Sequence, residues 1–281
     1  MKPEIELATH PGGRAEIVEL DADHPGFHDP EYRRRRNEIA QLALKYHGGD
    51  PVPRVVYTEE EQEVWRGVWQ MLAPLHARYA CREVLEAFRL LRLSCREIPQ
   101  LADVNEILQP LHGFRMLPVA GLVSSRTFLA YLGRNVFLST QYMRHHTMPL
   151  YTPEPDVVHE LVGHAATLAH PAFARLNRAF GLAIPRASDD EAVERIARLY
   201  WYTMEFGVAE EAGRLKVYGA GLLSSFGELG RFETEETLRP FDVDEVVNTP
   251  YDPTQYQSVL FAASSFPEMA DRVTAWLERF S

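Results

Sequence analysis

Apolar residues recur at helical spacing along much of this 281-residue chain, and one segment shows the pattern most clearly. Thr58, followed three residues later by Glu61, is the signature of a capping box, in which two side chains pair with backbone amides at the start of a helix. The apolar residues that follow lie on one face of this helix: Val64, Trp65, Val68, Trp69 and Leu72. The pattern therefore predicts an amphipathic helix that packs against a core.

The same periodicity predicts further helices over 30–46, 81–91, 100–111, 125–133, 156–163, 171–182, 189–205 and 267–280. Ser125 is placed to cap the helix over 125–133, and Asp189 with Asp190 opens the one over 189–205. VFLSTQY, from Val136, is the best strand candidate. The first 29 residues are rich in Pro, Gly, His and Asp and predict an extended lead-in. We expect a single domain over 1–281, mainly α with a minor β-sheet.

Charge and composition argue against several classes of protein. The net charge of −11 repels nucleic acid and anionic membranes, so we expect neither as a partner. No apolar run approaches the roughly 20 residues that span a bilayer, only two cysteines occur and no apolar leader begins the chain, which together predict a cytoplasmic protein. The one basic run, Arg33 to Arg36, lies between two glutamates and is interpreted as a solvated helix face.

The stretch VVHELVGH raises the question of a metal site. His159 and His164 are five residues apart, which on an ideal helix separates them by about 140°, whereas the i, i+4 histidines of zinc proteases are about 40° apart. The two histidines can share an ion only if the helix ends or distorts between them, and Gly163 would allow such a break. This pair alone is weak evidence for a metal.

A third ligand is available in YWYTMEFG, where Glu205 lies among aromatic residues. Its alternative interpretation is an ordinary surface glutamate on an amphipathic helix. Two histidines and one carboxylate would leave three coordination positions open, which suits non-haem iron(II) with O₂ and a co-substrate. A structural zinc would need four ligands and would favour thiolates, and no cysteine lies nearby.

Three further stretches have both a functional and an ordinary interpretation. Arg144 precedes a Pro-rich loop and could clamp a carboxylate, or could form a surface ion pair. Ser224, in a stretch of small residues, could orient a ligand histidine. The segment from Pro118 could place Phe128 against a flat heterocycle, or could be a plain loop before a helix.

Several motifs occur in an order that resembles a known family. They include DADHPGFHDPEYRRRRNEIA, GFRMLPVAGLVSSRTFL, TQYMRHHTMPLYTPEPDVVHELVGH and YGAGLLSSFGEL, and the match runs from about Leu20 to about Phe266. The chain resembles the pterin-dependent aromatic amino acid hydroxylases, and most of all the short bacterial phenylalanine hydroxylases. It departs from their pattern at Leu138, at the Ala165–Ala166 pair, and at Ala262, expected in a pocket loop.

The resemblance assigns roles to residues at matching positions. It implies a metal site of His159, His164 and Glu205, and a pterin site of Gly121, Leu122, Ser125, Phe128 and Glu160. It implies a substrate site of Arg144, Tyr151, Thr152, Pro153, Trp201, Phe206, Gly221 and Ser224. Glu160, Ser224 and Tyr200 are the candidate catalytic residues, and Arg126 with Asp190 is an expected structural salt bridge.

The resemblance also implies an activity. We expect an iron(II)- and tetrahydropterin-dependent monooxygenase that uses O₂ to convert L-phenylalanine to L-tyrosine, with tetrahydrobiopterin or a related pterin. Tryptophan 5-hydroxylation and phenylalanine 3-hydroxylation are alternatives within the family. A zinc hydrolase with Glu160 as base and a non-catalytic amino-acid-binding protein are alternatives outside it. We further expect a monomer without regulatory or tetramerisation domains and a role in phenylalanine catabolism.

Overall fold

The predicted helices form the framework of the fold in the computed structural model, which describes residues 20, 22, 24–150, 152, 154–234, 236–253 and 255–280. The α-helices are α1 (Pro30–Leu44), α2 (Glu59–Tyr79), α3 (Arg82–Leu91), α4 (Leu101–His112), α5 (Ser125–Leu132), α6 (Ala166–Leu168), α7 (Pro171–Ala183), α8 (Asp190–Tyr200), α9 (Ala220–Ser224), α10 (Phe226–Leu229), α11 (Val243–Val246) and α12 (Phe266–Arg279). Two π-helical segments, η1 (His159–Ala165) and η3 (Trp201–Glu205), and a 3₁₀ turn, η2 (Ile184–Arg186), complete them. Within the described residues, no helix is both long and apolar enough to span a membrane.

Local capping explains where several helices begin. At α2 the capping box is confirmed, because the Glu61 amide donates to the Thr58 hydroxyl and the Thr58 amide donates to the Glu61 carboxylate. The Asp189 side chain accepts from the first turn of α8, also as predicted. For α5, however, the capping residue is Ser124. The prediction of Ser125 was therefore wrong by one residue.

The strands are short and form two sheets within the described part of the chain. β1 (Arg115–Pro118) and β2 (Val136–Ser139) pair in parallel. The second sheet has the order β4-β3-β6-β5, formed by β3 (Val208–Glu211), β4 (Arg214–Val217), β5 (Thr237–Pro240) and β6 (Val259–Ala263). The strand predicted from Val136 is confirmed but ends at Ser139. A mainly α fold with minor sheets is thus confirmed.

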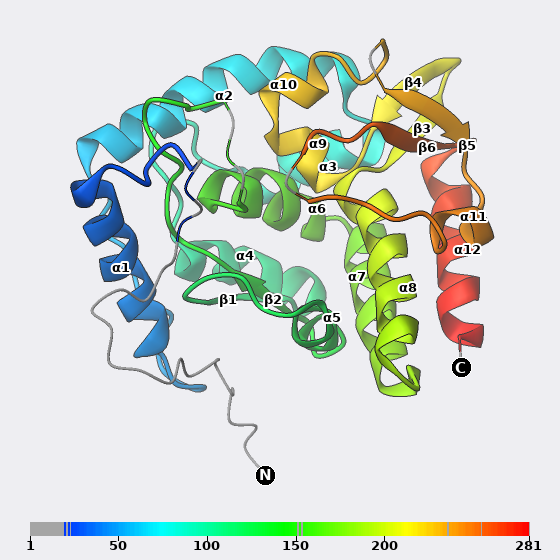
Figure 1. Ribbon diagram of the computed structural model, residues 1–281, viewed down its shortest axis with the longest axis horizontal. Coiled ribbons are helices and arrows are strands. Elements are labelled where there is room, and N and C mark those ends of the chain that lie inside the picture. Colours follow the sequence, from blue (N-terminus) through cyan, green and yellow to red (C-terminus); the bar gives the residue numbers. More distant parts are fainter. Residues whose placement is uncertain are drawn as a thin grey trace.

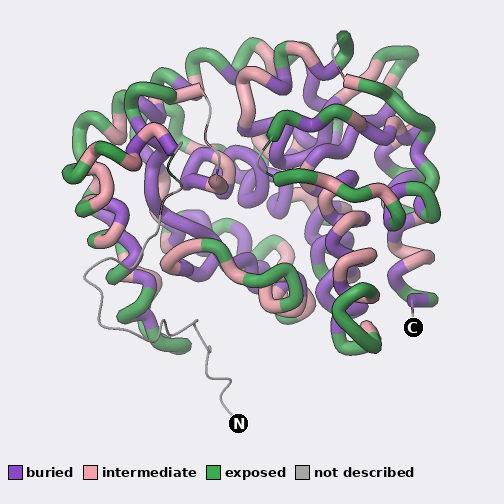
Figure 2. Tube along the Cα trace, viewed as in Figure 1, coloured by how far each residue is buried: buried purple, intermediate pink, exposed green. Residues whose placement is uncertain are grey.

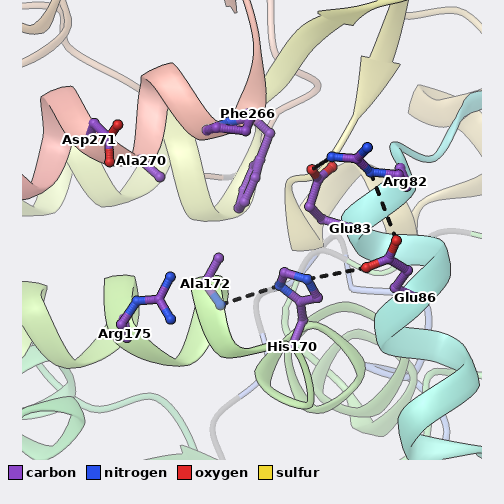
Figure 3. Close-up of a pocket in the computed structure, with 10 residues that line it drawn as sticks. Arg82, Glu83, Glu86, His170, Ala172, Arg175, Phe266, Ala270 and Asp271 are labelled. Atoms are coloured by element: carbon purple, nitrogen blue, oxygen red, sulfur yellow. Dashed lines mark hydrogen bonds and ion pairs between the residues drawn. The ribbon is translucent and has the colours of Figure 1, made fainter.

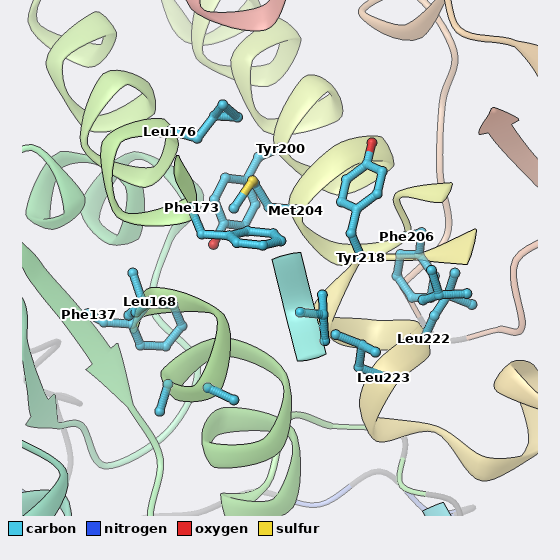
Figure 4. Close-up of a cluster of buried hydrophobic side chains, with 14 of the residues drawn as sticks. Phe137, Leu168, Phe173, Leu176, Tyr200, Met204, Phe206, Tyr218, Leu222 and Leu223 are labelled. Atoms are coloured by element: carbon cyan, nitrogen blue, oxygen red, sulfur yellow. The ribbon is translucent and has the colours of Figure 1, made fainter. Parts of the chain in front are cut away.

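The core surrounds the segment that carries the two histidines of the motif. In Figure 1, α6 lies in the middle of the molecule below α2, with α1 at one edge and α12 at the other. Figure 2 shows that this middle region is buried, and every residue of η1 after His159 is buried. Figure 4 shows side chains from α7, η3 and α9 gathered around it, among them Phe173, Met204 and Leu222. The motif helix is therefore held by packing on several sides.

The basic run in α1 is not a uniformly solvated face, and that interpretation was wrong for Arg36. Its side chain is 2% exposed and lies 2.8 Å from the Glu154 carboxylate. Its guanidinium also lies over the ring of Tyr142, 3.3 Å from the centroid. Burial of this cation is tolerated because a carboxylate and an aromatic face compensate for lost water. The pair ties α1 to the segment that leads into η1.

Candidate metal centre and substrate pocket

His159 and His164 lie on one face of η1 because this segment is π-helical. Hydrogen bonds from i to i+5 stack residues that are five positions apart, which an α-helix would spread around its axis. The two Nε2 atoms are 3.0 Å apart. The distorted helix that the spacing required is confirmed.

Gly163 has a different role from the one expected. The helix does not break there, and Gly163 is not among the glycines with positive φ. A Cβ at this position would lie 2.8 Å from both the Cβ and the carbonyl oxygen of Ala220. Glycine is therefore required because α9 packs directly against η1.

Glu205 completes the cluster from the end of η3, which continues α8. Its Oε1 lies 2.9 Å from His164 Nε2, and its Oε2 lies 3.5 Å from His159 Nε2. The three ligand atoms are all within 4.8 Å of one another, and the described residues contain no second such group of His, Cys, Asp or Glu. Two π-helical segments thus aim two imidazoles and a carboxylate at one point.

The hydrogen bond between Ser224 and His159 determines which imidazole nitrogen faces this point. The Ser224 hydroxyl donates its hydrogen to the carbonyl of Ala220, 2.8 Å away. Its oxygen therefore accepts the hydrogen bond from His159 Nδ1–H, at 2.9 Å. With Nδ1 protonated, neutral His159 presents the lone pair of Nε2. The expected pairing of Ser224 with His159 is confirmed.

The electrostatics of the cluster suit a cation. Burial lowers the pKa of His159 to about 4, so its imidazole stays neutral at physiological pH. Burial also opposes the charge on His164 and on Glu205, but their attraction outweighs it, so the pKa of His164 is raised and that of Glu205 is lowered. Glu205 therefore remains a carboxylate, whose charge a bound metal cation would balance.

Glu160 follows His159 but points at different partners. Its carboxylate accepts from the backbone amide of Thr140 at 2.9 Å and from the Thr140 hydroxyl at 3.0 Å. Burial raises the pKa of Glu160 to about 7, against the opposing effects of His164 and Thr140. A carboxyl group that is near half-protonation at neutral pH can hold a proton or accept one.

A cavity of about 210 Å³ opens beside the cluster and contains both the expected metal and pterin residues. Its lining includes the three candidate ligands together with Gly121, Leu122, Ser125, Phe128, Glu160, Tyr200 and Trp201. Besides Leu138, eight lining residues had no predicted role: Val119, Val123, Leu129, Phe137, Thr140, Pro155, Ala197 and Tyr251. No local signal in the sequence marked them.

Arg144 does not line this cavity; it is buried and paired with Asp156, which the sequence did not indicate. Its Nε and Nη2 donate to the two Asp156 oxygens at 2.9 and 2.7 Å, and both side chains are almost fully buried. Burial alone would raise the pKa of Asp156, but the Arg144 cation outweighs it and holds the pKa below its usual value. A third guanidinium hydrogen goes to the Pro149 carbonyl. By count, one hydrogen on each terminal nitrogen remains for a ligand.

Thr152, Phe206 and Gly221 do not line the cavity, although Phe206 packs against Trp201, which does. The ring centroids of Phe206 and Trp201 are 4.8 Å apart, and a Cβ on Gly221 would lie 2.7 Å from Cζ of Phe206. The Thr152 hydroxyl donates to the Glu154 carbonyl. The Tyr200 hydroxyl bonds to Asn177, so its ring rather than its hydroxyl borders the cavity. Tyr151 and Pro153 lie outside the described residues.

The remaining expectations have mixed outcomes. Arg126 and Asp190 form the predicted salt bridge, at 3.1 Å. Leu138 lines the cavity, so this departure does change its wall. Ala262 lies in β6, paired with Val208, rather than in a pocket loop as expected.

A second cleft, between α3, α7 and α12, is not the functional site that the motifs predict (Figure 3). Its volume is about 310 Å³. Its charged groups largely neutralise each other, since Arg82 pairs with Glu83 and Glu86, and His170 with Glu86. Its lining shares no residue with the metal cluster.

Comparison with known proteins identifies the family. Residues 14–281 match the biopterin-dependent aromatic amino acid hydroxylases, and the chain belongs to this family. It is 49% identical to tyrosine 3-monooxygenase of Canis lupus familiaris over 93% of this chain and 54% of that one, and 46% identical to phenylalanine-4-hydroxylase of Rattus norvegicus over 91% and 57%. The chain therefore spans little more than half the length of these curated relatives.

A solved structure shares the fold. Phenylalanine hydroxylase from Chromobacterium violaceum, with bound iron(III) and 7,8-dihydrobiopterin, superposes with a TM-score of 0.75 at 29% identity, covering 84% of this chain and 89% of that one.

Proposed function

We propose that this protein is an iron(II)- and tetrahydropterin-dependent monooxygenase that hydroxylates the ring of L-phenylalanine to give L-tyrosine, with O₂ as co-substrate. The observation that carries the proposal is the convergence of His159, His164 and Glu205 on one point beside an aromatic cavity. The family assignment supports the pterin and argues against the zinc-hydrolase and binding-protein alternatives.

The donor set fits iron(II). Two imidazoles and one carboxylate leave coordination positions open, which a closed structural zinc site would not. The bond from Ser224 orients the Nε2 lone pair of His159 toward the metal position. When bound, iron(II) and the tetrahydropterin would supply the electrons with which O₂ is activated.

The protein's own groups bind, orient and exclude water. Phe128, held edge-on by Phe137 at 5.2 Å, offers an aromatic face to a pterin ring. Trp201 and Tyr251 form the aromatic wall for the substrate ring. The remaining Nη hydrogens of Arg144, whose side chain is 2% exposed and paired with Asp156, are the proposed partners of the amino acid's carboxylate. Glu160 holds a proton near the pterin-binding residues.

Product identification tests the proposal. Purified protein with iron(II) and a tetrahydropterin is incubated separately with phenylalanine, tyrosine and tryptophan, and products are assigned by mass spectrometry and NMR. We expect L-tyrosine from phenylalanine, with loss of turnover when iron, pterin or O₂ is withheld. Turnover without O₂ or pterin would refute the proposal.

Tyrosine 3-hydroxylation is a second candidate, because the tyrosine 3-monooxygenases match this chain at 47–49% identity and phenylalanine-4-hydroxylase at 46%. A 3,4-dihydroxyphenylalanine product would establish this second candidate. A monomeric state, a cytoplasmic location and a role in phenylalanine catabolism stay predictions.

A further inference from the structure

Gln257 is a buried residue whose side-chain amide forms hydrogen bonds with three other residues. Its Oε1 accepts from the Trp201 indole nitrogen at 2.8 Å. Its Nε2 donates to the backbone carbonyls of Gln255 at 3.1 Å and Asp252 at 3.3 Å. An amide has one carbonyl and two N–H groups, so both of its N–H groups and its oxygen are bonded. The side chain, 7% exposed, does not itself line the cavity.

The groups that Gln257 joins form one wall of the substrate pocket. Trp201 stacks on Tyr251, with ring centroids 4.3 Å apart and planes at 16°. Both rings line the cavity that holds the metal cluster. Trp201 belongs to η3, whereas Tyr251 belongs to the segment between α11 and β6. Gln257 therefore bridges the two chain segments that supply this wall.

The backbone of Gln257 is also hydrogen-bonded to a third segment, α10. The backbone amide of Gln257 donates to the Glu228 carboxylate in α10 at 3.0 Å, and Glu228 is 6% exposed. Because its backbone amide and its side-chain amide are both bonded, Gln257 cannot turn without breaking several hydrogen bonds. The orientation of the indole is thereby fixed relative to the core and not only relative to Tyr251.

We propose that Gln257 is a specificity-determining residue that sets the width of the pocket through Trp201 and Tyr251. This inference rests on the proposed function, since it concerns which aromatic ring fits beside the metal. With the bridge in place, the stacked wall stands at one fixed position that suits a single six-membered ring. Without it, the indole loses its acceptor and the segment carrying Tyr251 loses two backbone contacts, so the wall retreats and admits a larger ring.

The test is a change in substrate preference. Gln257→Met keeps the length of the side chain but removes every hydrogen bond of the amide. We expect the ratio of kcat/KM for phenylalanine to that for tryptophan to fall on the order of tenfold, as is typical when the shape of an apolar pocket changes by about one methylene. Backbone amide hydrogen exchange in residues 249–258 of metal-free Gln257→Met should be faster than in the unmutated protein. This measurement reports the loosening of the Trp201–Tyr251 wall without relying on turnover.

A matched control separates this effect from a general loss of stability. Gln100 also bonds a backbone amide and carbonyl through its side chain, both belonging to Val55, and it does not line the cavity. Gln100→Met should lower thermal stability yet leave the phenylalanine-to-tryptophan ratio and the exchange in 249–258 unchanged.

A second variant keeps the proposal testable if Gln257→Met does not fold. Trp201→Phe removes the same hydrogen bond from the other side, and it should also raise exchange in 249–258, because the bridge loses one end. We then combine both substitutions in one protein. Adding Gln257→Met to Trp201→Phe should change the phenylalanine-to-tryptophan ratio of kcat/KM less than Gln257→Met does alone, because the hydrogen bond to the indole is already absent.

The possible outcomes separate a failure of the specificity role of Gln257 from a failure of the proposed function. An unchanged ratio in a folded, active Gln257→Met protein overturns the specificity role, as does a fully additive double variant. If Gln257→Met does not fold, unchanged exchange in Trp201→Phe overturns it. A wild-type protein that hydroxylates none of the three amino acids refutes the proposed function instead, and the specificity role, which depends on it, falls as well.

Discussion

The buried pair of Arg144 and Asp156 gives a prediction whose size follows from the structure. Asp156 accepts from the Arg144 backbone amide, from two guanidinium nitrogens and from the backbone amide of His159. Asp156→Asn keeps the shape of the side chain but removes the charge and replaces one acceptor oxygen with a donor. A guanidinium that is 2% exposed is then left without its counter-ion.

The expected loss of stability is large. Removing one partner of a buried ion pair typically costs about 3–5 kcal/mol. Typical domains have a free energy of unfolding of only about 5–15 kcal/mol. For a chain of 281 residues, with about 2.1 cal/mol/K of unfolding entropy per residue, the loss corresponds to a Tm lower by about 5–8 °C.

The measurement is urea unfolding of both proteins in the metal-free state, with Asp103→Asn as control. Asp103 forms a similar two-pronged pair with Arg54, but both side chains are at least half exposed. Exposed pairs contribute about 0–1 kcal/mol, so the control should barely change the midpoint. Equal losses in the two variants would refute the reasoning that burial makes the Arg144 pair costly to break.

Three further predictions concern iron, pH and assembly. His164→Ala or Glu205→Ala should remove most bound iron and turnover while the fold persists, and elemental analysis that finds wild-type iron in both would contradict the metal assignment. Burial raises the pKa of Glu228, so the folded chain binds this proton more tightly than the unfolded chain and stability falls as pH rises above about 4.5. The stability of Glu228→Gln relative to the unmutated protein, measured by urea unfolding, should therefore be greater at pH 7 than at pH 4. A difference between the two proteins that does not depend on pH would count against this reasoning. Light scattering should report a monomer, because net charge disfavours self-association, and a concentration-independent tetramer would show otherwise.

The sequence predicted the long helices because their apolar period repeats over several turns. The capping box at Thr58 even located the start of α2. All the strands within the described residues span only four or five residues, and only β2 lies in a stretch that the sequence marked, VFLSTQY. Strands so short offer too little alternation to identify, and some pair across long separations, as Val208 does with Ala262.

The candidate site was predicted where its chemistry leaves a local trace. Histidines five residues apart can share an ion only where the helix ends or distorts, and the π-helical η1 meets this condition. Buried charges left no such trace. Arg36 lies in a run of four arginines that resembles a solvated face, and only the position of Glu154, which is 118 residues away, explains its burial. Likewise, nothing in the sequence indicated that Arg144 is buried and paired with Asp156.

Gln257 illustrates the same limit most sharply. Its neighbours in sequence indicate a polar loop residue, yet Trp201 is 56 residues away and Glu228 is 29 residues away. A side chain whose hydrogen bonds are all satisfied in the folded state produces no conflict in the sequence that could reveal it. Spacing can therefore show which local distortion a shared metal site would need. Residues that position the pocket wall by satisfying distant partners require the fold, and in this protein they include the one from which we infer substrate preference.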